Sequence, residues 1–180
     1  MSQAATLYRI SNNEFIELEK LDNKNHFDFN AHSKDATTFE GSFMALEYVL
    51  SKGQENMVLE LIRQIFTPIK SFGGFDFSGA ITDEEIDFIL KNSDTLIPYL
   101  DTNTISKLNG ILDKVSETDI NLRYSSKELN ENGIYPRVWH DDDSKGFVYN
   151  KRQILEDLVK LKSIFSRASK ENDYILVLIE

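Results

Sequence analysis

The clearest hydrophobic pattern lies near the C-terminal end of the sequence. Between residues 151 and 170, apolar side chains recur at steps of three and four, which places them on one face of a helix. This set consists of Ile154, Leu155, Leu158, Leu161, Phe165 and Ala168. Residues 173–179 are instead almost continuously apolar, which is typical of a strand covered on both faces. The pattern therefore predicts a long amphipathic helix that packs on a sheet, followed by a buried strand.

Shorter elements of both kinds fill the rest of the chain. Residues 7–10 are predicted to form a strand, and Ser11 and Glu14 then have the S-x-x-E spacing of a helix capping box. The polar residues 22–38 are predicted to be mainly loop. Apolar residues at helical spacing predict helices at residues 39–50, 55–66 and 102–115, and shorter helical turns near 117–123 and 126–130. Weaker patterns predict a short strand or tight loop at residues 75–77 and a helix that begins after Thr82.

These elements define the expected fold class. Strands and helices are interspersed, and the sequence has no internal repeat or low-complexity segment. Its 180 residues lie within the range of about 100–200 that is usual for one domain. Hydrophobic residues make up 41% of the chain and aromatic residues 11%, which is enough for a sizeable core. We therefore expect a single α+β domain over residues 1–180, in which a small mixed β-sheet packs against several helices.

A further strand is predicted at residues 134–139, directly after Gly133. Alternation along this strand would place Tyr135, Arg137 and Trp139 on one face. Tyrosine, arginine and tryptophan are the residues most enriched at binding hot spots, so this face is a candidate binding patch. The same face could also be buried under a helix, which we favour for Tyr135, while Arg137 and Trp139 remain open to either interpretation.

The order of these C-terminal elements resembles that of a known family. A strand containing Ile134-Tyr135-Pro136, a long helix and a terminal apolar strand are similar to the YfbM-like family of small bacterial domains, which has an E-I-Y-P strand. Residues 43–53 are also similar to the family's W-x-x-L-H-F-L-L-T-G helix, with Phe43 in place of the tryptophan and Glu47 where the family commonly has histidine. The resemblance implies the fold, but the family has no established activity.

The charge of the chain restricts its partners. Acidic residues number 30 against 20 basic ones, which gives a formal net charge of −10. Such a surface repels nucleic acids and anionic membranes and attracts basic proteins. The sequence contains no cysteine, and we find neither a secretory signal nor an apolar run long enough to span a membrane. We therefore expect a cytoplasmic protein whose partner is a basic protein, with no nucleic acid and no membrane.

Residues 140–143, His-Asp-Asp-Asp, are the best candidate for chemistry. An imidazole beside three carboxylates offers ligands to a divalent cation, and Asp141 and Asp143 fit the first positions of an EF-hand loop. Lys145 and Arg152, however, occupy two further ligand positions of that loop. We therefore predict no metal site, and a solvated acidic turn before the long helix explains the same residues.

Two hypotheses for function follow. The sequence has no nucleophile elbow, phosphate-binding loop or metalloprotease motif, so we expect no cofactor and favour a non-catalytic protein. The first hypothesis is an acidic protein-binding module, such as an immunity or antitoxin-type protein that neutralises a basic toxin. Its candidate binding residues are Arg137, Trp139, His140, Asp141 and Asp143. The alternative is a small-molecule-binding protein or small enzyme at the same turn, with His140 as base and Asp141 or Asp143 as its orienting group or as a metal ligand.

Overall fold

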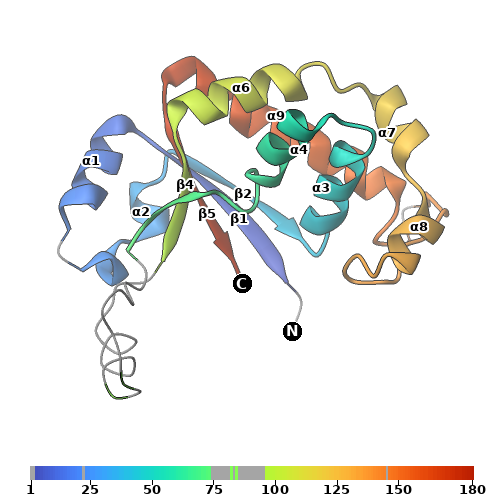
Figure 1. The fold of residues 1–180 in the computed structure, drawn as a ribbon, viewed down its shortest axis with the longest axis horizontal. Helices are drawn as coiled ribbons and strands as arrows, with labels where there is room; N and C mark the ends of the chain where they lie inside the picture. Colours follow the sequence, from blue (N-terminus) through green and yellow to red (C-terminus); the bar gives the residue numbers. More distant parts are fainter. Residues whose placement is uncertain (1–2, 22, 74–81, 83, 85–95, 145) are drawn as a thin grey trace.

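A five-stranded antiparallel sheet runs through the centre of the computed structural model (Figure 1), which describes residues 3–21, 23–73, 82, 84, 96–144 and 146–180. Its strands are β1 (Ala4–Ile10), β2 (Asp35–Glu40), β3 (Lys70–Phe72), β4 (Ile97–Leu100) and β5 (Tyr174–Ile179). They lie side by side in the order β2-β1-β5-β4-β3. The last strand of the chain is therefore the central strand of the sheet.

The α+β class is confirmed, but the sheet is not the mixed one that we predicted. All four strand pairings in the described residues are antiparallel. The apolar run at the C-terminus indicated that β5 is covered on both faces, yet such a run does not indicate the direction of the neighbouring strands. Strand direction depends on where each connection returns the chain to the sheet.

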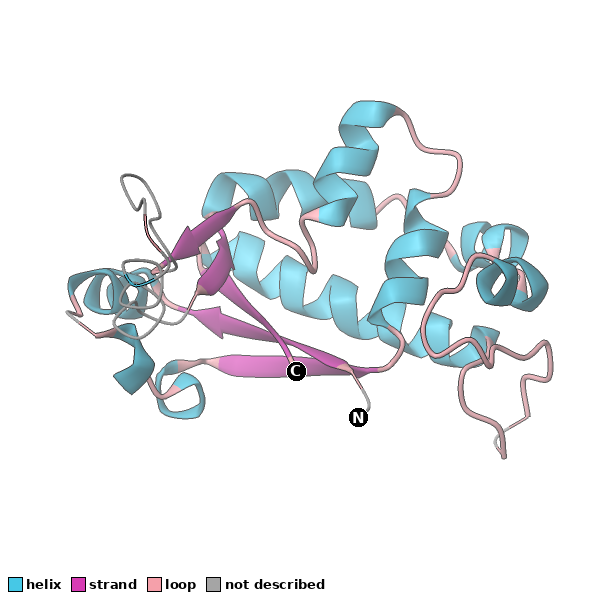
Figure 2. Ribbon diagram, turned by 60° about the horizontal axis from the view of Figure 1, so that its bottom comes forward, coloured by secondary structure: helices cyan, strands magenta, loops and turns pink. Residues whose placement is uncertain are grey.

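Helices cover both faces of this sheet. The α-helices of the described residues are α1 (Asn12–Lys20), α2 (Phe29–His32), α3 (Phe43–Ser51), α4 (Asn56–Arg63), α6 (Thr102–Leu112), α7 (Glu117–Arg123), α8 (Ser126–Glu131) and α9 (Lys151–Glu171). Figure 2 shows most of them gathered along one side of the sheet. Ile175 and Val177 of β5 belong to the larger core on that side, whereas Leu176 belongs to a smaller core with Phe15 and Leu18 of α1. The prediction of a final strand buried on both faces is thus confirmed.

Helix α9 is the long amphipathic helix that the sequence predicts. Its predicted apolar residues are buried, except for the partly buried Leu155. The same face also buries a carboxylate, Asp157, which accepts a hydrogen bond from Ser42 Oγ (2.5 Å) and one from Lys160 Nζ (2.8 Å). Asn150 caps the N-terminus of the helix, and its side chain accepts a hydrogen bond from Gln153 N at 3.1 Å. This cap fixes the point at which the preceding loop joins the helix.

The N-terminal half contains a correction. We predicted loop at residues 22–38 and a helix from residue 39, but β2 pairs with β1 along its whole length and includes Phe39. Strand β2 lies at the edge of the sheet, and Phe39 is its one buried residue, so an alternating apolar pattern is missing from its sequence. The helix begins only at Phe43. The other predicted helices are confirmed within a few residues, and the predictions at residues 75–77 and after Thr82 fall largely outside the described residues.

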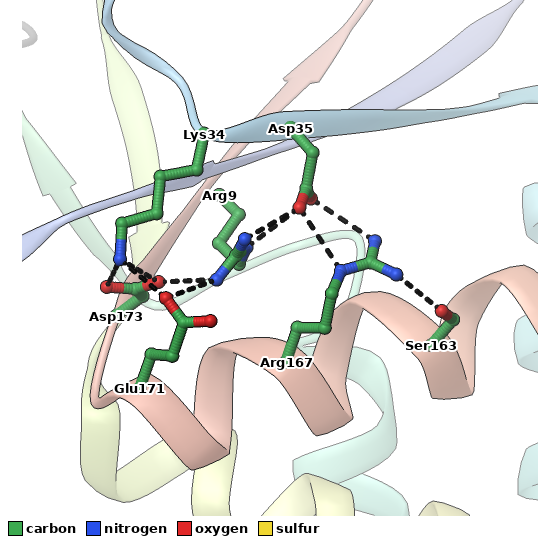
Figure 3. A network of polar contacts seen from close by, with 7 residues as sticks. All are labelled: Arg9, Lys34, Asp35, Ser163, Arg167, Glu171 and Asp173. Atoms are coloured by element: carbon green, nitrogen blue, oxygen red, sulfur yellow. Dashed lines mark hydrogen bonds and ion pairs between the residues drawn. The ribbon is translucent and has the colours of Figure 1, made fainter.

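A network of ion pairs ties the end of α9 to the sheet (Figure 3). Arg9 of β1 is buried and pairs with Asp173, which is only 2% exposed, at 2.7 Å, and with Asp35 at 2.8 Å. Lys34 also reaches Asp173 (2.9 Å), and Arg167 of α9 reaches Asp35 (3.1 Å). Because the buried charges of Arg9 and Asp173 are paired, we interpret the network as a structural tie between β1, β2, α9 and β5. None of the helices in the described residues combines the length and apolar character that crossing a bilayer requires.

Candidate functional site

The segment that we predicted as a strand at residues 134–139 is a turn, so that prediction is wrong. Arg137 N donates a hydrogen bond to Ile134 O (2.9 Å), which closes a tight turn containing Pro136. Arg137 has φ 68°, a left-handed conformation that does not fit an extended strand. Proline also lacks the amide donor that a sheet requires. Tyr135, Arg137 and Trp139 therefore do not share the face of a strand.

Trp139 lies beneath the surface. Its side chain is 3% exposed, and its Nε1 donates to the carbonyl oxygens of Ile134 (3.2 Å) and Tyr135 (3.1 Å). The indole packs edge-on against Tyr149, with ring centroids 5.7 Å apart. Arg137 is exposed, and its Nε donates to Gly133 O at 3.1 Å. Of these two candidate binding residues, Arg137 is open to a partner, whereas Trp139 supports the surrounding loop.

Residues 137–149 form a loop, and contacts of His140 with Tyr149 and Asn150 close its base. His140 N donates to Tyr149 O (2.9 Å), and His140 and Asn150 form an isolated parallel bridge. The buried Asn150 side chain donates to Asp142 O (2.9 Å) and Phe147 O (3.0 Å). Tyr124, which directly follows α7, lies outside the loop, and its hydroxyl donates to His140 O at 2.6 Å. One asparagine thus caps α9 and also holds both halves of the loop.

The acidic residues of this loop point into solvent. Asp141, Asp142 and Asp143 are all exposed, and Asp143 pairs with Lys151 at 3.1 Å. Ser144 N donates to Asp142 Oδ1 (2.8 Å), and hydrogen bonding from Ser144 holds the pKa of Asp142 below its ordinary value. These carboxylates form a solvent-exposed acidic turn before α9.

The charge of this turn also acts on Tyr124. Burial raises the pKa of Tyr124, and the negative charges of Asp141 and Asp143 raise it further. The hydroxyl consequently remains protonated and keeps its hydrogen bond to His140.

The alternative hypothesis, catalysis at His140, calls for an orienting group beside its imidazole. In the described part of the chain, neither Asp141 nor Asp143 forms a hydrogen bond with the imidazole of His140, so no orienting pair is formed. No group of three or more histidine, aspartate or glutamate side chains in these ranges is arranged to hold a metal ion. The ring of His140 instead lies 5.6 Å from that of Phe147.

Exposed apolar residues flank this acidic turn, and sequence reasoning missed them. Val138 is 50% exposed, Phe147 46% and Val148 63%. The bridge between His140 and Asn150 brings the two segments that carry these side chains together. Figure 1 places this loop at the end of the molecule opposite α1 and α2, and Figure 2 shows loop segments projecting at that end. In the sequence, the apolar pair Phe147-Val148 inside an otherwise polar stretch indicates this exposed surface.

The family is decided by comparison with known proteins. A family model described as "Domain of unknown function (DUF1877)" matches residues 1–178. The chain belongs to this family. Among solved structures, it is similar to YfbM from Escherichia coli, a protein of unknown function, with a TM-score of 0.64 and 16% sequence identity over 98% of this chain and 99% of that chain. No curated protein matches.

Membership in the DUF1877 family confirms the resemblance that the sequence indicates and fixes the fold, but it assigns no activity. The helix that resembles the family's tryptophan-containing motif is α3. On it, Phe43 is buried in the larger core, and Glu47 lines an open cavity.

Proposed function

We propose that this protein is an acidic, non-catalytic module that binds a basic protein through the loop at residues 137–149. An immunity or antitoxin-type role, in which the module neutralises a basic toxin, is the form of this proposal that we favour. The observation that carries it is a projecting loop on which exposed Val138, Phe147 and Val148 lie among the exposed carboxylates of Asp141 to Asp143. Protein interfaces commonly combine an apolar centre with a polar rim in this way.

The base of the loop supports this proposal because it is already ordered. Hydrogen bonds from Asn150 and Tyr124, together with the buried Trp139, hold the described residues at this base in place without a partner. A surface that is ordered before binding loses less conformational entropy when it binds. Arg137 and Tyr149 at its two ends also adopt left-handed φ angles of 68° and 58°. Residues other than glycine are uncommon there, and such strain is often found at functional sites.

Charge supports a basic partner. The chain carries a formal net charge of −10, and the carboxylates of the loop would lie at the rim of the contact. Charges in that position accelerate encounter with a partner of opposite sign. A stable interface buries about 800 Å² on each partner, so the loop would form its centre and neighbouring surfaces would complete it.

The absence of cysteine supports placing this interaction in the reducing cytoplasm.

The test is recovery of a partner from the source organism with matched variants as bait. The wild-type protein is expected to retain a basic protein, and Phe147→Ser is expected to lose it because an apolar anchor is removed. Asp141→Asn with Asp143→Asn removes two carboxylates while keeping the hydrogen bond between Asp142 and Ser144. The matched control, Glu17→Gln with Glu19→Gln on α1, removes the same charge from another surface.

The loop variants and the control separate a specific site from general acidity. We expect the control bait to retain the partner as the wild type does. Equal recovery by wild type and Phe147→Ser would contradict the proposed site, and recovery of an acidic partner would contradict the proposed charge complementarity.

A further inference from the structure

An open cavity of about 440 Å³ lies between α3 and α4, beside the end of β5. Its apolar wall consists of Phe43, Met44, Leu59, Ile134 and Ile179. Small-molecule sites in proteins are usually hollows of about 300–1,000 Å³ with mostly apolar walls and a few polar groups. No residue of the loop at 137–149 lines this cavity, so it is independent of the proposed interaction site.

Two opposite charges line the cavity, Glu47 from α3 and Arg63 from α4. In the described ranges, they form neither a hydrogen bond nor an ion pair with each other or with another residue, although the charge of Arg63 acts on Glu47. Burial is the main influence on Glu47 and raises its pKa to about 7 despite Arg63. Both ends of this charge pair are thus available to a ligand.

Other polar groups in the cavity help to define the site. Ser51 lies one helical turn after Glu47 on α3, and within the described structure its buried Oγ has no hydrogen-bond partner. Tyr48 also lines the cavity, but its hydroxyl donates to Glu128 at 2.6 Å and is already engaged. Glu60 lines an adjoining hollow that shares Glu47 and Arg63. The titratable groups around Glu47 are therefore Arg63, Tyr48 and, across the adjoining hollow, Glu60.

We propose that this cavity binds a small zwitterion of the α-amino acid class with an apolar side chain. The ligand's ammonium group pairs with the carboxylate of Glu47, and its carboxylate pairs with the guanidinium of Arg63. An unpaired carboxylate among apolar side chains is costly, so a ligand cation stabilises its charged form. A guanidinium matches a carboxylate in planar, two-point geometry. The apolar wall then receives the side chain of the ligand, and Ser51 Oγ provides a further polar contact.

Isothermal titration with L-leucine tests this proposal, with L-phenylalanine and L-methionine to cover larger and straighter side chains. Two truncated analogues isolate the charges, since 3-methylbutylamine is leucine without its carboxylate and 4-methylpentanoate is leucine without its ammonium group. We expect at least one of the three amino acids to bind. Each of the two truncated analogues should bind at least about tenfold more weakly than leucine, because one charge-assisted contact is lost.

Variants and pH assign the contacts to residues. Glu47→Gln and Arg63→Met should each weaken binding about tenfold or more, whereas Glu55→Gln, an exposed carboxylate outside the cavity, should leave it unchanged. Binding by the wild type should tighten about tenfold between pH 6 and pH 8, as Glu47 ionises around its pKa of about 7, and Glu47→Gln should lose this dependence. Thermal melts establish that each variant is folded.

Three results would overturn the proposal. The first is that none of the three amino acids binds at about 10 mM, a concentration well above the dissociation constants of specific sites. The others are equal affinity for leucine and 3-methylbutylamine, or an affinity of Glu47→Gln equal to that of the wild type. Asp141→Asn with Asp143→Asn should bind the amino acid as the wild type does. The outcome is therefore independent of the proposed protein-binding function.

Discussion

Replacing Glu47 by glutamine should change the pH dependence of stability. In the folded protein, burial raises the pKa of Glu47 from the ordinary 4.5 to about 7, so the folded state binds a proton more tightly than the unfolded state. Stability from this group is fully present below the unfolded pKa and is lost as the pH rises through about 7. Glutamine keeps the shape of the side chain and carries no charge at either low or high pH.

The magnitude follows from the two pKa values. At about 1.4 kcal/mol for each pH unit, the change from 4.5 to about 7 corresponds to at most about 3.4 kcal/mol. About 2.5 kcal/mol of this falls between pH 5 and pH 8. Glu47 lines an open cavity and is partly reached by water, which screens its charge, so we expect about 1 kcal/mol.

Urea unfolding followed by circular dichroism measures this effect at pH 5, 6, 7 and 8. The free energy of unfolding of Glu47→Gln, relative to that of the wild type, should rise by about 1 kcal/mol between pH 5 and pH 8. The contributions of other titrating groups cancel in this comparison, and Glu55→Gln controls for the substitution itself. A difference that does not change with pH, or one that favours the wild type more strongly at pH 8, would show that folding does not raise the pKa of Glu47.

Three further predictions concern the packing that holds the loop and the sheet. Asp173→Ala leaves the buried Arg9 without its closest partner and should lower the free energy of unfolding by about 3 kcal/mol in urea melts, whereas a change below about 0.5 kcal/mol would show that the network contributes little. Asn150→Ala removes the cap of α9 and two hydrogen bonds to the loop, so we expect a loss of about 2 kcal/mol and faster amide exchange in the loop than in the wild type. Deleting residues 174–180 removes the central strand, whose buried side chains contribute about 1.5–3 kcal/mol each, and should abolish the cooperative thermal melt; a melt near the parent temperature would count against this role of β5.

The elements that could be predicted from sequence are those whose own residues carry the signal. Helix α9 has an apolar stripe at helical spacing, and β5 has an uninterrupted apolar run, so both were predicted with their buried faces. Strand β2 could not be recognised, because only Phe39 faces the core and the polar residues before it look like loop. Its place in the sheet comes from pairing with β1 and from the ion pairs of Asp35, which are contacts between distant parts of the chain.

The candidate sites likewise differ in whether neighbouring residues in the sequence indicate them. His140, Asp141 and Asp143 were predicted from a local cluster, and the structure places them on one exposed loop. The prediction of a strand at residues 134–139 was wrong, because the alternating residues there belong to a turn in which Trp139 is buried. The cavity of Glu47 and Arg63 could not be predicted, since it forms only where α3, α4 and the end of β5 meet.

Binding through the loop is tested most sharply by the rate at which this protein associates with the basic partner that we propose, once that partner is isolated. It is measured for the wild type, Asp141→Asn with Asp143→Asn, Phe147→Ser, and the control Glu17→Gln with Glu19→Gln. Ionic strength is varied from about 0.1 M to about 1 M, over which the screening length falls from about 10 Å to about 3 Å.

We expect the wild-type rate to fall about tenfold or more over that range, and the Asp141 and Asp143 variant to associate several-fold more slowly at low salt. Phe147→Ser should chiefly accelerate dissociation, by about tenfold or more, because an apolar anchor is lost. The control should follow the wild type closely. Association and dissociation rates that are the same for both loop variants as for the wild type would contradict binding through this loop.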